Sequence, residues 1–200
     1  MLTEEILFLD LMKEDLFWMT NELFVDTDCI SSFLWVRKMN IIQELYGGRI
    51  IIPDPVYQEL SHPSVRFMKI KVDGLISNKD AKIKTIDYDT EEYRLYNSMI
   101  KSKDRKIIGK GEAGAIALAK VYDGILVSNN YKDIKDYIEE YNLRHLDTGQ
   151  ILLEALRKNI ITEDEGNEIW SKMLSKGIFL PKKTFTEYKK TSCIYVTVLL

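Results

Sequence analysis

Four acidic residues occupy positions where a predicted strand ends or a predicted helix begins. They are Asp26, Glu59, Glu112 and Asp133. Because the ends of strands in an α/β sheet converge on one edge, we expect these carboxylates to lie together. Carboxylates gathered there repel one another unless a hard cation neutralises them, and oxygen ligands suit Mg²⁺ or Mn²⁺. The chemistry that such a site supports best is phosphodiester hydrolysis.

Each acid taken alone has a structural explanation. Asp26 and Asp28 could cap the helix that follows them, and Glu112 could complement the dipole of its own helix. Glu59 and Asp133 could be solvated helix residues. Only the joint arrangement favours a site over these alternatives.

The composition is that of an ordinary globular protein. The chain has 200 residues, of which 46% are hydrophobic and 30% charged, and this length fits one domain with a sizeable core. Its net charge of -3 supplies no overall positive field, so any contact with nucleic acid must come from a local basic patch.

Nothing in the sequence indicates export or insertion into a membrane. Glu4 and Glu5 stand where a signal peptide would be positive, and no apolar run is long enough to cross a bilayer. The two cysteines, Cys29 and Cys193, have no spacing typical of a zinc or redox site, and Cys29 is expected to be a buried apolar side chain. These features predict a cytoplasmic protein.

Apolar runs that alternate with helical patterns predict an α/β fold with a mostly parallel sheet and helices on both faces. Expected strands cover residues 23–25, 49–52, 82–86, 125–128 and 142–146. Expected helices cover residues 3–20, 29–46, 90–100, 112–122, 132–141, 149–158 and 163–176, with a further helix that begins at Asp54 as its cap and a short helix or loop around 65–70.

Both ends of the chain carry unexplained apolar residues. The helix at 3–20 is apolar on all sides, so it either packs on the domain or meets a partner. The tail at 192–200 is open to three interpretations: a strand, a partner contact or a read-through remnant. The predicted division is an N-terminal helical extension at 1–22, a central domain at 23–158 and a C-terminal extension at 159–200.

Four short segments resemble the motifs of PIN-domain nucleases. Val25-Asp26-Thr27-Asp28 is similar to the first motif, Glu59-Leu60 to the second, Gly111-Glu112 to the third and Ser128-Asn129-Asn130 with Asp133 to the fourth. Their order and spacing also match, and the similarity covers about residues 23–146. The resemblance implies a PIN-like three-layer α/β/α fold and a toxin of a type II toxin–antitoxin pair, of the virulence-associated protein C class, or an orphan relative.

The resemblance also implies roles for individual residues. Asp26 would be the central metal ligand, Glu112 and Asp133 would complete the acidic cluster, and Glu59 would act through a bound water or a second layer of contacts. Thr27, Ser128 and Asn130 would support these carboxylates or orient a water. Asn130 departs from the family, where Asp is frequent, and leaves the fourth acidic role to Asp133.

A basic loop precedes Glu112. Its cations are Lys101, Lys103, Arg105, Lys106 and Lys110. A charge run of this kind is ordinarily a solvated loop, but beside a metal site it would guide an RNA backbone.

These observations predict a Mg²⁺- or Mn²⁺-dependent endoribonuclease that acts on RNA, is paired with an antitoxin protein and forms a homodimer. One alternative is a catalytically weak PIN-like domain that binds nucleic acid or serves assembly. A Rossmann-like cofactor binder is a third class, but no glycine fingerprint follows the strand at 23–25.

Overall fold

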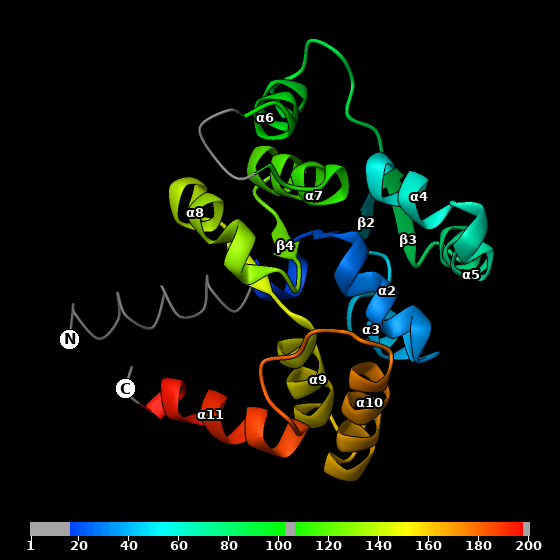
Figure 1. Ribbon diagram of the computed structural model, residues 1–200, viewed down its shortest axis with the longest axis vertical. Coiled ribbons are helices and arrows are strands. Elements are labelled where there is room, and N and C mark those ends of the chain that lie inside the picture. The colour runs from blue at the N-terminus through cyan, green and yellow to red at the C-terminus, as the bar shows by residue number, and fades with distance from the viewer. Residues whose placement is uncertain (1–16, 103–106, 198–200) are drawn as a thin grey trace.

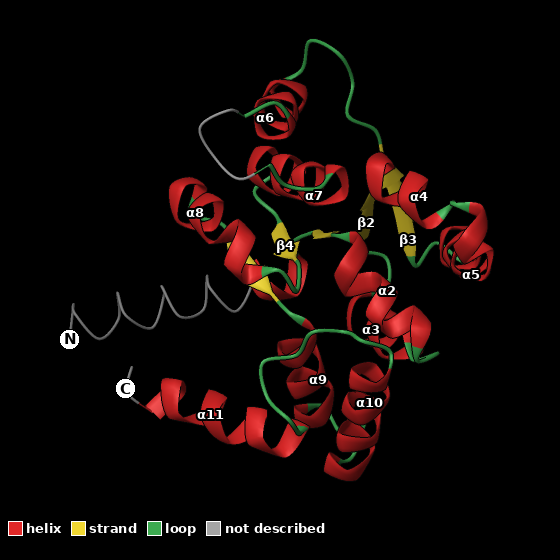
Figure 2. Cartoon of the chain, viewed as in Figure 1, coloured by secondary structure: helices red, strands yellow, loops and turns green. Residues whose placement is uncertain are grey.

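The chain folds around a five-stranded parallel sheet. The computed structural model describes residues 17–102 and 107–197, and the side chains up to residue 192. Within these residues the strand order is β3-β2-β1-β4-β5, with every neighbouring pair parallel. Figure 1 labels β2, β3 and β4, and Figure 2 draws the strands in yellow. The strands are β1 (Leu23–Val25), β2 (Ile50–Pro53), β3 (Ala81–Lys84), β4 (Ile125–Val127) and β5 (Arg144–Leu146).

The three inner strands are continuous apolar runs because both of their faces are covered. Every residue of β1, β2 and β4 is buried. Leu23 of β1 is in register with Ile50 of β2 on one side and Ile125 of β4 on the other. The expected parallel α/β sheet is therefore confirmed, and all of its strands, rather than most, are parallel.

Alternate residues of these strands build two separate cores. Leu23 and Val25 pack with residues of α2, α3, α4, α5, α9, α10 and α11, whereas Phe24 packs with residues of α6, α7 and α8. Because side chains of a strand point to opposite faces in turn, this division defines the three layers. The bounds are α2 (Thr27–Trp35), α3 (Met39–Tyr46), α4 (Asp54–Leu60), α5 (Arg66–Ser77), α6 (Glu91–Ile100), α7 (Lys110–Val121), α8 (Tyr131–Tyr141), α9 (Thr148–Arg157), α10 (Glu163–Ser175) and α11 (Phe185–Thr197), with a 3₁₀ turn at η1 (Pro63–Val65).

The helix expected at 29–46 is wrong as a single element. The chain forms α2 and α3 instead, because Arg37 adopts the left-handed region at φ 59° and breaks the helix there. The Lys38 N–H then bonds the carbonyl of Phe33 at 2.9 Å and closes the end of α2. Left-handed Arg has no strong sequence signature, so the break was not visible in the pattern.

Two other expectations need correction on this side of the sheet. The short helix or loop around residues 65–70 is the longer α5. Asp54 does not cap α4 but is its first residue, and its Oδ1 accepts the N–H of Ile86 at 3.2 Å, so it anchors the loop after β3.

The two termini are only partly described. Of the helix expected at 3–20, residues 17–20 are helical and the remainder lies outside the described residues. The tail forms the end of α11 as far as Thr197, which excludes a strand there. Phe185 of α11 and Trp170 of α10 are fully buried against each other, with ring centroids 5.9 Å apart. The division at residues 22 and 158 stays a prediction.

Candidate metal and catalytic site

Asp26 stands directly after β1, at the edge of the sheet where the strands end. It is fully buried and caps α2: its Oδ1 accepts the N–H of Cys29 at 2.7 Å. The capping role expected for Asp26 is thus real, but it uses only one of the two carboxylate oxygens.

The other oxygen of Asp26 is unusual. Oδ2 is buried and accepts no hydrogen bond from the described part of the chain. Burial raises the pKa of Asp26 from 3.8 to about 8, and the charges of Asp28 and Glu112 add to the increase, while the Ser128 hydroxyl and the Cys29 N–H oppose it. A carboxyl in this condition is neutral near pH 7 unless a cation approaches it.

Glu112, on a second element, also has a buried carboxylate oxygen without a hydrogen-bond partner among the described residues. It lies in the first turn of α7, where its Oε2 accepts the N–H of Gly109 at 3.3 Å and its Oε1 is buried without a partner among the described residues. Burial raises the pKa of Glu112, the charges of Asp28 and Asp133 raise it further, and Asn130 and Gly109 lower it. Two buried, unpaired carboxylate oxygens, one on the residue after β1 and one on α7, therefore belong to one electrostatic group.

Asn130 connects this group to Asp133. Its side-chain Nδ2 donates to Asp133 Oδ2 at 2.9 Å, and its interaction with Glu112 lowers the pKa of that carboxyl. The Asn130 backbone N–H donates to Ser128 Oγ at 3.2 Å. Because Ser128 also acts on Asp26, the loop after β4 touches all three acids.

Glu59 is held differently from the other acids. It is exposed at the end of α4, where it accepts hydrogen bonds from Thr27 Oγ1 and from the N–H of Gly111, the latter at 3.0 Å. A Cβ at Gly111 would lie 2.6 Å from Thr27 Oγ1 and 2.8 Å from Glu59 Oε2, so a larger residue would force these side chains to move. Glu59 thus ties the start of α2 to the start of α7, next to Glu112.

Three further residues at this edge were given no role at the site by the sequence analysis. Asp28 adds its charge to Asp26 and Glu112, and burial raises its own pKa. Asn129 joins α2 to α9, because it donates to Ser32 Oγ at 3.2 Å and accepts the N–H of Thr148 at 3.0 Å. His145 Nε2 lies 2.7 Å from the carbonyl oxygen of Ser128. Asp28 lies within the first motif and Asn129 within the fourth, and that position was the available signal.

The carboxylate oxygens of this site are ligands that suit a hard divalent cation, although the side chains do not surround a common point. No three His, Cys, Asp or Glu side chains stand close enough together to hold a metal ion within residues 17–102 and 107–192. The two orphaned oxygens of Asp26 and Glu112 nevertheless lack the positive partner that a buried carboxylate requires. Mg²⁺ or Mn²⁺ takes carboxylate oxygens and retains waters, so it can complete such a site.

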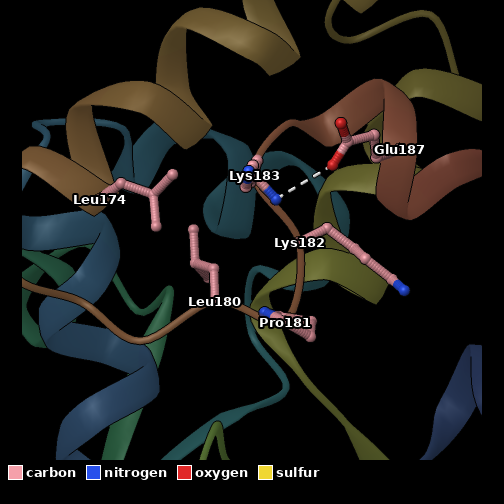
Figure 3. A pocket seen from close by; sticks show the side chains of 6 residues that line it. All are labelled: Leu174, Leu180, Pro181, Lys182, Lys183 and Glu187. Carbon is pink, nitrogen blue, oxygen red and sulfur yellow. Dashed lines mark hydrogen bonds between the residues drawn. The ribbon is translucent and has the colours of Figure 1, made fainter.

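Other surface features lie apart from these acids or outside the described residues. Of the expected RNA-binding cations, Lys110 is exposed at the first position of α7, and Lys103, Arg105 and Lys106 lie outside the described residues. A groove of about 570 Å³ between α10 and α11 contains none of the acids (Figure 3). It is lined by Leu174, Leu180, Pro181, Lys182, Lys183 and Glu187.

Comparison with known families identifies the family of the chain. A family model described as a PIN domain matches residues 8–192. The chain belongs to the PIN-domain family. PIN domains are typically metal-dependent nucleases. None of the curated proteins compared with this PIN domain matches it. Along the described helices, no stretch combines the length and the apolar character that crossing a bilayer requires.

Proposed function

We propose that this PIN domain is a metal-dependent endoribonuclease. The observation that carries the proposal is the pair of buried, unpaired oxygens on Asp26 and Glu112. Asp26, Glu112 and Asp133 would hold Mg²⁺ or Mn²⁺, with Asp28 beside them. When bound, the cation would lower the pKa of a water and stabilise charge on the phosphoryl oxygens.

The chain's own residues prepare the carboxylates for that role. Asn130 fixes Asp133, and the N–H groups of Cys29 and Gly109 orient one oxygen of Asp26 and one of Glu112. Each hydrogen bond leaves the second oxygen directed elsewhere, which is the arrangement that a metal ligand needs. Glu59, held by Thr27 and Gly111, is a positioning residue for α7, and its exposure also allows it to contact a bound water.

The biological setting that we propose is a toxin of a type II toxin–antitoxin pair in the cytoplasm. Support comes from the four motif resemblances and from the family match, which extends over residues 8–192. RNA would be held by the cations at Lys103, Arg105, Lys106 and Lys110. An antitoxin protein would bind the chain, and a second copy would form a homodimer through the apolar N-terminal helix or the C-terminal tail.

A second candidate is a catalytically weak PIN domain that binds nucleic acid or serves assembly. It is favoured by Asn130 at a position where Asp is frequent, and by the spacing of the acids, which leaves no ready-made group of three within the described chain. In this case the raised pKa of Asp26 would be a persistent feature of the protein rather than a condition that metal relieves.

Titration of metal together with a cleavage assay separates the two candidates. Isothermal titration with Mn²⁺ should show binding that Asp26→Asn strongly weakens, and the same preparation should cleave single-stranded RNA only with the metal. Metal binding without cleavage of a broad RNA panel would favour the binding module. Equal Mn²⁺ affinity in wild type and Asp26→Asn would contradict the metal site itself.

A further inference from the structure

Two aromatic side chains from different helices meet on the surface of the molecule. Trp35 ends α2 and Phe67 lies in the first turn of α5, and these two helices are neighbours (Figure 1). Their ring centroids are 4.9 Å apart at an interplanar angle of 56°, yet Trp35 is 40% and Phe67 41% exposed. Ile70, one turn further along α5, is 61% exposed. We call these three residues the aromatic platform.

The core does not account for the aromatic platform. On α2 the buried side chains are Cys29, Ile30, Ser32, Phe33 and Leu34, and on α5 they are Met68, Val72 and Leu75. Trp35, Phe67 and Ile70 lie outside both sets and present adjoining apolar surface to water. Adjoining exposed apolar residues of this size mark a binding surface.

The charge around the aromatic platform identifies the kind of ligand. Residues 29–40 and 60–72 contain five cations, one histidine and no Asp or Glu, in a chain whose net charge is -3. Lys69 is paired with Asp73, and Lys38 is near Glu165. Arg37, Arg66 and Lys71 have no anionic partner in the described chain, and all three are exposed. Aromatic rings flanked by unpaired cations are the combination that binds single-stranded nucleic acid.

One helix connects the aromatic platform to the catalytic acids. Asp28 and Trp35 are seven residues apart, which places them on the same side of α2 with a separation of about 10 Å along its axis. Both are exposed, and the half-buried Ser31 lies between them on that side. Asp28 in turn acts electrostatically on Asp26 and Glu112. A strand bound at the acids can therefore continue along α2 to Trp35.

We propose that the aromatic platform stacks an unpaired base of the RNA, next to the nucleotides that occupy the acidic site. The proposal rests on the proposed ribonuclease function and deepens it. It makes the substrate single-stranded at this position, because a base held in a duplex cannot reach a side-chain ring. Arg37, Arg66 and Lys71 hold the adjoining phosphates, and the base contact is independent of sequence because every base has a π-face.

The test measures RNA binding and RNA cleavage separately. A fluorescent single-stranded oligonucleotide is titrated with the full chain in EDTA, so that no cleavage occurs. Trp35→Leu is expected to weaken binding by about five-fold to about a hundred-fold, the effect of losing one stacked base, and Trp35→Phe to retain most of the affinity. The control is Phe179→Ala, an aromatic residue that is 83% exposed outside both segments, and it should bind like wild type. Equal affinity of Trp35→Leu and wild type would overturn the proposal.

The contribution of the cations is tested by salt dependence. The double variant Arg66→Gln and Lys71→Gln should lower the slope of log affinity against log salt by about 1.4, because each lost phosphate contact on a single strand contributes roughly 0.7. An unchanged slope would remove α5 from the path of the RNA. If Trp35→Leu changes the oligomeric state but leaves the RNA affinity at the wild-type value, the aromatic platform is a protein contact and the proposal is overturned.

The outcomes also separate this inference from the proposed function. If wild type binds RNA through Trp35 in EDTA but cleaves nothing with Mn²⁺, the platform stands and the nuclease proposal fails. If wild type cleaves RNA and Trp35→Leu binds and cleaves equally well, the nuclease proposal stands and the platform fails. An abasic nucleotide can be placed at successive positions of an RNA that the protein cleaves. Wild type should bind less tightly when the abasic nucleotide is at one position beside the cleavage site, whereas the affinity of Trp35→Leu should not change at that position.

Discussion

Replacing Asp26 by Asn should stabilise the metal-free protein. The pKa of Asp26 is about 8 in the fold against an ordinary value of 3.8, and burial is the main cause. A raised pKa of this kind favours the fold below pH 3.8, and that contribution is lost as pH rises toward 8. At pH 7 the loss amounts to roughly 4 kcal/mol, obtained from about 1.4 kcal/mol for each unit of pH above 3.8.

Asn removes the titration but introduces a new cost. Its carbonyl oxygen can still accept the Cys29 N–H, whereas its amide nitrogen takes the place of Oδ2, which has no partner in the described chain. An unsatisfied buried donor costs about 1–3 kcal/mol. The expected net result at pH 7 is a gain of roughly 1–3 kcal/mol in the free energy of unfolding, and a flatter dependence of stability on pH.

The assay is urea unfolding in EDTA, followed by circular dichroism between pH 5 and 8. Wild type should lose stability as the pH rises, and Asp26→Asn should lose less, with the remaining dependence coming from Glu112 and Asp28, whose pKa values are also raised. Asp136→Asn, on the exposed face of α8, is the matched control and should stay within about 0.5 kcal/mol of wild type. Saturating Mn²⁺ should then stabilise wild type and leave Asp26→Asn unaffected. A less stable Asp26→Asn that keeps the wild-type pH dependence would refute the reasoning.

Three other predictions concern separate parts of the chain. Gly111→Ala should lower RNA cleavage at least ten-fold in a folded protein, because the added Cβ would collide with Thr27 and Glu59; wild-type rates would show that this connection is dispensable. Replacing three loop cations, Lys103, Arg105 and Lys106, by Gln should weaken RNA binding and reduce its salt dependence. An unchanged salt slope would exclude the loop from binding. Light scattering should show that the full chain is an oligomer, and that a chain starting at Asn21 differs from it in oligomeric state or stability. If both proteins are monomers of equal stability, the N-terminal helix has no role in an interface or in the core.

The sequence predicted the sheet well because its inner strands are buried on both faces. Residues 50–52 and 125–127 are uninterrupted apolar runs, which are typical of central parallel strands because both faces of such strands are buried. The helix break at Arg37 and the helix α11 were missed. Arg37 takes its left-handed conformation without glycine, and the weakly amphipathic α11 depends on tertiary contacts such as the packing of Phe185 on Trp170.

The candidate site was predictable only in part, because its hydrogen bonds join residues that are distant in the sequence. Asp26, Glu112 and Asp133 could be placed at one edge because each follows a strand end or begins a helix. Which oxygens are left without partners could not be predicted, because this depends on caps and loops brought together from distant segments. The aromatic platform was missed likewise, since Trp35 and Phe67 are 32 residues apart and meet only when α2 packs against α5.

The most direct test of the central claim is RNA cleavage by matched variants of one helix. Asp133 contributes its charge to Glu112 and is fixed by Asn130, whereas Asp136, three residues along α8, is exposed. With Mn²⁺ and a labelled single-stranded RNA, wild type and Asp136→Asn should cleave at similar rates. Asp133→Asn should be at least a hundred-fold slower, and EDTA should abolish cleavage in all three. Cleavage that persists in EDTA, or equal rates for Asp133→Asn and Asp136→Asn, would contradict a metal-dependent nuclease at this edge of the sheet.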